Sequence, residues 1–78
     1  MTDNMMEYKI IFLEELAQFR GTLSLSRYNW LKGIVRSVDE NNKDKIYVAM
    51  GYIMGLRDSG VYTGDLKLCL ENILIEIR

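Results

Sequence analysis

Ile46–Leu56, IYVAMGYIMGL, is the stretch of sequence that decides the fold. Its eleven residues carry no charge, and each of them is apolar, aromatic or glycine. A helix of this length spans about 16 Å, roughly half of the hydrocarbon core of a bilayer. The stretch therefore predicts a helix buried in a protein core rather than a membrane span, and we expect the other segments to pack around it.

The composition is typical of one small globular domain, covering residues 1–78. The hydrophobic fraction is 49% and the charged fraction is 27%. A core of this size gives little net stability, so small chains often add a disulfide, a metal ion or a second subunit. Cys69 is the only cysteine and histidine is absent, so neither an internal disulfide nor a zinc site is expected. We therefore expect a homodimer.

The pattern of apolar residues predicts an all-α fold, a small bundle of three to four short helices. The chain has no proline and no Asn-Gly or Asp-Gly pair, which disfavours hairpins. Apolar residues recur at helical spacing over about residues 4–20, 26–38, 43–58 and 64–76. A strand near the end is an alternative, because isoleucines alternate at 73, 75 and 77, but the helical spacing is satisfied over a longer window. We expect the first and fourth helices to pack on the third, which would lie at the centre.

Short polar residues and glycines indicate where the helices begin and end. Ser24 or Ser26 is the expected cap of the second helix, and Thr63 that of the fourth. Gly21 and Gly60 lie where left-handed stops of the first and third helices are expected.

The second predicted helix has a basic and aromatic surface. Residues 21–38 include no acidic residue, in a chain whose net charge is −1. The side chains expected outside the core or at its edge include Arg27, Asn29, Trp30, Lys32 and Arg36. Tryptophan and arginine are enriched in binding hot spots, so this surface is the candidate site for a macromolecular partner. A solvated helix face without a binding role is the alternative.

DNA is a second candidate partner for this helix. Ala17 and Gly21 are spaced as in a helix-turn-helix motif, whose second helix would present Asn29, Lys32 and Arg36 to the major groove. The register is unfavourable, because Arg27 falls where such a motif buries an apolar residue. Few basic groups are present, and much of the affinity for DNA comes from neutralising phosphates. A protein partner is therefore expected in preference to DNA.

Two pairs of residues are candidates for a dimer interface. Gly51 and Gly55 lie one helical turn apart, and small residues at this spacing let another helix approach closely. That helix belongs either to the same chain or to a second copy. Leu68 and Ile75 lie in line on the side of the last helix opposite its apolar face. Ile11 is likewise an aliphatic residue on the polar side of the first helix. Burying an aliphatic side chain is worth roughly 1.5–3 kcal/mol, which matters for a chain of this size.

The residues do not predict catalysis, a cofactor, a metal or a small-molecule substrate. Histidine is absent, no glycine-rich phosphate loop occurs, and Cys69 falls on an apolar helix face. The first residues lack the basic region of a signal peptide, and the lone thiol indicates the cytoplasm. We therefore expect a non-catalytic cytoplasmic regulatory or adaptor protein that binds a protein partner as a homodimer. The alternative is a DNA-binding transcriptional regulator that uses the basic second helix.

Overall fold

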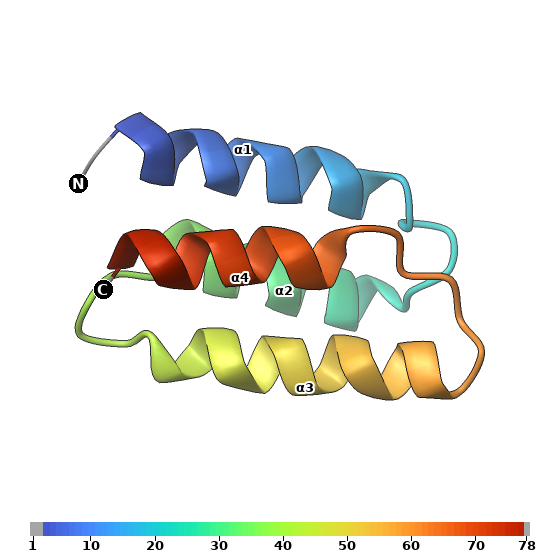
Figure 1. Ribbon diagram of the computed structural model, residues 1–78. Helices are drawn as coiled ribbons and strands as arrows, with labels where there is room; N and C mark the ends of the chain where they lie inside the picture. The colour runs from blue at the N-terminus through green and yellow to red at the C-terminus, as the bar shows by residue number, and fades with distance from the viewer. Residues whose placement is uncertain (1–2, 78) are drawn as a thin grey trace.

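A computed structural model describes residues 3–77 of the chain and contains, in that range, four α-helices and no strand. The helices are α1 (Asp3–Ala17), α2 (Leu25–Ser37), α3 (Asp44–Asp58) and α4 (Leu66–Ile77). They run alternately in opposite directions and are joined by residues 18–24, 38–43 and 59–65 (Figure 1). The predicted all-α bundle of short helices is confirmed, and residues 73–77 are helical rather than extended.

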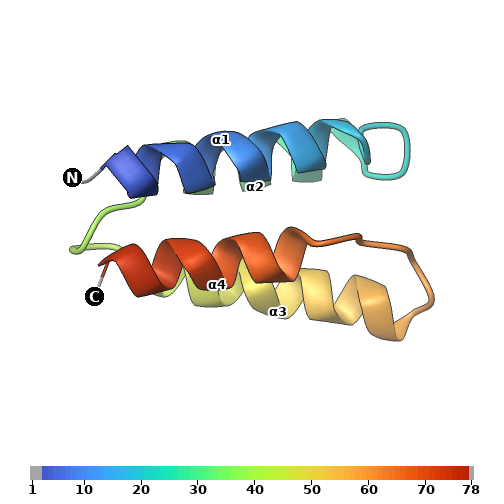
Figure 2. The ribbon, with the colours of Figure 1, turned by 45° about the horizontal axis from the view of Figure 1, so that its top comes forward.

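The four helices form two layers of two. α1 and α2 make one layer and α3 and α4 the other (Figure 2). Each helix has two close neighbours: α1 and α3 each pack against α2 and α4, while the Cα atoms of the diagonal pairs stay more than 8 Å apart. The result is an antiparallel four-helix bundle with extents of 33 × 20 × 19 Å. No helix within residues 3–77 has the length and apolar composition needed to cross a membrane.

One core runs along the bundle axis. Every helix contributes to it, and α4 contributes more buried residues than any other helix. The buried apolar residues are Met5, Phe12, Leu16, Leu31, Ile34, Val35, Val38, Ile46, Ala49, Ile53, Leu66, Cys69, Leu70, Ile73 and Leu74. Their spacing of three and four residues within each helix is the reason that one side of every helix faces inward.

The prediction that the third helix lies at the centre is wrong. α3 packs on α4, as expected, but it lies diagonally across the bundle from α1, with no Cα atoms of the two helices within 8 Å. Only Ile46, Ala49 and Ile53 of α3 are buried, and the opposite side of the helix faces solvent. A helix of a four-helix bundle buries one side only, so apolar residues around the whole circumference leave an exposed apolar side.

Two helix boundaries differ from the predicted ones by two residues or more. α1 ends at Ala17, and residues 18–20 continue as tight turns with hydrogen bonds to carbonyls three residues back. Gly21 does not adopt a left-handed conformation, whereas Gly60 does, with φ of 88°. α4 begins at Leu66, two residues later than predicted, because Gly64 has φ of 54° and cannot belong to a right-handed helix.

Candidate functional site

α2 carries the predicted partner-binding residues, and its position in the bundle is set by its cap and its buried side. Ser24 is extended, with φ of −63° and ψ of 152°, and its Oγ accepts a hydrogen bond of 3.2 Å from the Arg27 N–H. This is the N-cap geometry that the sequence predicts. Leu31, Ile34 and Val35 are buried on the inner side, so the polar residues between them are turned outward.

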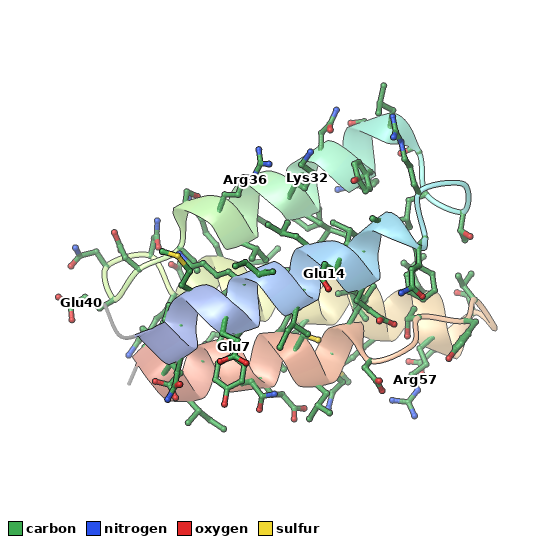
Figure 3. The ribbon with its side chains drawn as sticks, turned by 90° about the horizontal axis from the view of Figure 1, so that it is seen from above. Glu7, Glu14, Lys32, Arg36, Glu40 and Arg57 are labelled. Carbon is green, nitrogen blue, oxygen red and sulfur yellow. The ribbon has the colours of Figure 1, made fainter. Side chains whose placement is uncertain are left out.

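The five predicted residues are not all on one surface. Lys32 and Arg36 project from α2 on the side away from Glu7 and Glu14 of α1 (Figure 3). Arg36 is exposed and Lys32 is half-buried. The exposed basic side chains of α2 therefore lie apart from these two carboxylates of α1.

Arg27 and Trp30 lie on the side of α2 that meets α3. The guanidinium carbon of Arg27 is 5.2 Å from the ring centres of both Trp30 and Tyr52. The two rings meet edge to face, with their centres 5.5 Å apart. Trp30 therefore helps to join α2 to α3, and a stacked cation is worth roughly 0.5–1 kcal/mol at such exposed sites. Tyr52, which the sequence pattern did not single out, completes this cluster.

A second cation–aromatic cluster lies near the start of α2. The Tyr28 ring has Arg20 on it, at 5.8 Å, and also the Lys32 ammonium, at 5.4 Å. Arg20 was not among the predicted site residues, although it lies immediately before the acid-free segment and could have been grouped with it.

A shallow groove separates α2 from α3 on the outside of the bundle. Its lining residues are Asn29, Trp30, Gly33, Ile34, Ser37, Lys45 and Val48. Gly33 has open space where a Cβ would be, so the wall of the groove is low at its middle. The groove combines an indole and aliphatic side chains with one amide and one ammonium group, a composition suited to a protein side chain or a short helix.

The basic residues of α2 are not neutralised by the protein itself. Among residues 3–77 the structure contains one salt bridge, between Lys67 and Glu71 of α4. Arg27, Lys32 and Arg36 therefore lie without a carboxylate partner in the described part of the chain. Such cations remain available to acidic groups on a partner.

The single thiol lies in the core. Cys69 is buried, and burial raises its pKa, with further increases from the nearby carboxylates of Glu15 and Asp65. A raised pKa lowers the thiolate fraction at neutral pH, and the thiolate is the reactive form. Within residues 3–77, no group of three or more His, Cys, Asp or Glu side chains is arranged to hold a metal ion.

The candidate dimer residues lie on two different helices. Gly51 and Gly55 are exposed on α3, and no atom lies within 4 Å of where their Cβ atoms would be. Within residues 3–77 no other helix therefore approaches them, which contradicts the interpretation that they serve packing within the bundle. Leu68 and Ile75 are 54% and 63% exposed on α4, on the side away from the core. The exposed apolar side chains next to the two glycines on α3 were not among the predicted interface residues.

A comparison with known protein families, curated proteins and solved structures finds no match to this chain. The function is therefore inferred from the surfaces of the molecule alone.

Proposed function

We propose that this protein is a small non-catalytic regulatory or adaptor protein of the cytoplasm, which acts as a homodimer and binds another protein through α2. The observation that carries the proposal is the combination of unneutralised cations and accessible aromatic rings on α2. Lys32 and Arg36 face outward, and Arg27 stacks on Trp30 and Tyr52 beside the α2–α3 groove. Aromatic and arginine side chains around an apolar groove form the usual centre of a protein-binding surface.

The chemistry of the chain supports a binding role over catalysis. The sequence has no histidine for acid–base chemistry, and its one thiol is buried with a raised pKa. A buried thiol of this kind behaves as a small core residue.

The arrangement of α1 and α2 favours protein over DNA as the partner. A helix-turn-helix motif crosses its two helices at about 90–120°. α1 and α2 instead lie side by side and run in opposite directions along the bundle (Figure 2). α2 therefore lacks the steep crossing by which a recognition helix enters a major groove, and few basic groups remain to neutralise phosphates.

Affinity capture with the tagged protein and two surface variants tests the proposal. We expect one or more proteins to bind the wild type and to be lost from Trp30→Ala and Arg36→Ala. Leu68→Ala, on the far side of α4, is the matched control and should retain them. If both α2 variants retain every bound protein, α2 is not the binding surface.

The same experiment separates a protein partner from DNA. Protein capture should survive nuclease treatment, and affinity should change only moderately with added salt. Bound nucleic acid whose affinity falls steeply with salt would instead support the DNA-binding alternative.

A further inference from the structure

The α2–α3 groove is lined by apolar and neutral polar side chains, with one cation and no carboxylate. Its apolar part consists of the Trp30 ring and the side chains of Ile34 and Val48. Trp30 is half-buried and Val48 is 59% exposed, so both present apolar surface to the outside of the bundle. A groove with an apolar floor and a few polar groups fits the apolar side chains of another molecule.

The two helices that border the groove differ in charge. Residues 21–38 include no acidic side chain, and Arg36 lies three residues after the groove residue Gly33, so it is on the α2 edge of the groove. Residues 46–56 of α3 carry no charge. A ligand that lies along the groove therefore meets cations on its α2 side and uncharged side chains along most of its α3 side.

Two further cations lie at the ends of the groove. Lys45 lines it where α3 begins, and Arg27 lies over the Trp30 ring near the start of α2. Arg27 precedes the groove residue Ser37 by ten residues, which is about 15 Å along a helix. A segment of about three helical turns therefore reaches from one end of the groove to the other.

The carboxylates nearest to the groove in the sequence lie beyond one end of it. Asp39 and Glu40 belong to the α2–α3 connection, and Asp44 is the first residue of α3. None of the three lines the groove, and within residues 3–77 none forms a salt bridge with Lys45 or with a cation of α2. The groove therefore has a local excess of positive charge in a chain whose net charge is −1.

We propose that the α2–α3 groove binds an acidic amphipathic helix of the protein partner, about three turns long. This inference rests on the proposed function and names the class of segment that α2 recognises. The apolar side of such a helix covers Trp30 and Val48, and its carboxylates face Arg27 and Arg36 on α2. Burial of an apolar helix side in a groove is a recurring mode of peptide recognition, and complementary charge sets the choice of partner.

Gly33, in the wall of the groove, favours a helix as the bound segment. Its φ is not positive, and no atom lies within 4 Å of where its Cβ would be, so the bundle itself does not require glycine here. Glycine weakens a helix relative to alanine. Its small size instead lets a second helix approach α2 closely, because the distance between packed helices depends on the side chains at their contact.

Selection from a displayed library of random peptides, each about four helical turns long, tests the class of ligand without assuming a sequence. The whole protein is the bait. We expect the selected peptides to combine apolar residues at helical spacing with an excess of Asp and Glu. Because the whole chain has a net charge of −1, such an excess reports the local charge of the groove. Basic peptides, acidic peptides without apolar residues at helical spacing, or no selected peptide at all would overturn the inference.

Trp30 is the only tryptophan of the chain, so its fluorescence reports binding in the groove. A selected peptide without tryptophan should shift this emission, and Arg36→Glu should weaken its binding by about tenfold or more. Arg57→Glu reverses an exposed charge on α3 outside the groove and is the matched control, which should bind as the wild type does. Equal affinities of Arg36→Glu and Arg57→Glu would show that the α2 cations do not select the ligand.

Variants of Gly33 test the position of the peptide. Gly33→Leu fills the groove and should abolish the change in Trp30 emission, whereas Gly33→Ala should keep it. A Cβ at this position meets no atom of the bundle, so circular dichroism should show that both variants keep their helices. Unchanged binding by Gly33→Leu would place the peptide outside the groove.

Two comparisons separate this inference from the proposed function. A captured protein that depends on α2 but docks through a segment that is neither acidic nor helical overturns this inference alone. If no captured protein depends on α2, the proposed function fails as well. A mixed-sequence DNA duplex that shifts the Trp30 emission and displaces the selected peptide would identify the ligand as nucleic acid and overturn both.

Discussion

Gly64 lies in the α3–α4 connection, two residues before α4 begins, and its replacement by alanine tests how this connection fits the bundle. Its φ is 54°, a left-handed conformation that costs an L-residue about 1–2 kcal/mol. A Cβ at this position would also meet the Glu15 carboxylate and, at 3.1 Å, the Cζ atom of Phe19 on the chain after α1. Gly64→Ala therefore combines backbone strain with a steric conflict.

Gly60 offers a matched control for the backbone term alone. Its φ is also positive, at 88°, but a Cβ there would have no atom within 4 Å. We expect Gly60→Ala to lower the free energy of unfolding by about 1–2 kcal/mol. Gly64→Ala should lower it by about 1–3 kcal/mol more, the usual cost of inserting a methyl group into a filled space. The lower part of that range is expected, because the Glu15 side chain is half-buried and can move aside.

Urea denaturation followed by circular dichroism measures both changes. The variants must be compared at equal protein concentration, because association shifts the apparent stability. A Gly64→Ala variant that is no less stable than Gly60→Ala would refute the close packing of residue 64 against the end of α1.

Three further changes have outcomes that follow from single contacts. Ser24→Ala removes the acceptor for the Arg27 N–H, so unfolding should become easier by about 1 kcal/mol, measured by urea denaturation. Phe12→Ala empties a fully buried position, and the same measurement should show a loss of about 3–5 kcal/mol. Burial and nearby carboxylates raise the pKa of the Cys69 thiol, so the native protein keeps this proton to higher pH than the unfolded chain does. The free energy of unfolding should therefore fall as the pH rises above the ordinary thiol pKa, and Cys69→Ala should fall less over that range.

Sequence patterns were sufficient where one side of a helix is apolar and the other is polar. α2 is the best example, because the Ser24 cap and the buried Leu31, Ile34 and Val35 could all be inferred from spacing. The exposure of Leu68 and Ile75 on α4 also follows from spacing, since they lie opposite the apolar face. Local hydrogen bonding and helical periodicity determine these features without knowledge of the neighbouring helices.

The pattern was insufficient where an element is apolar on every side. Periodicity shows which residues of α3 can be buried, but the choice of buried side depends on which helices lie beside it. The diagonal position of α1 relative to α3 is a property of the whole bundle. For the same reason the contact of Arg27 with Tyr52 could not be predicted, because it joins residues of two helices through their relative rotation.

Gly64 illustrates a different limit. Thr63 precedes an apolar run and resembles an N-cap in the sequence, so the fourth helix was expected to begin at once. The left-handed φ of Gly64 delays it to Leu66 and lets the connection pass close to Phe19. A glycine within a predicted first turn is compatible with both structures, and only tertiary packing distinguishes them.

Oxidation of the unmodified protein by dilute peroxide tests most directly whether a second copy covers the exposed side of α3 that carries Gly51 and Gly55. Met54 lies on that face, whereas Met6 of α1 lies outside it, and they are 45% and 58% exposed in the single chain. Mass spectrometry of peptides gives the rate of sulfoxide formation at each methionine. We predict that the rate at Met54 falls relative to that at Met6 as the protein concentration rises through the dimerisation range. A ratio of the two rates that does not change with protein concentration would contradict a dimer contact on α3.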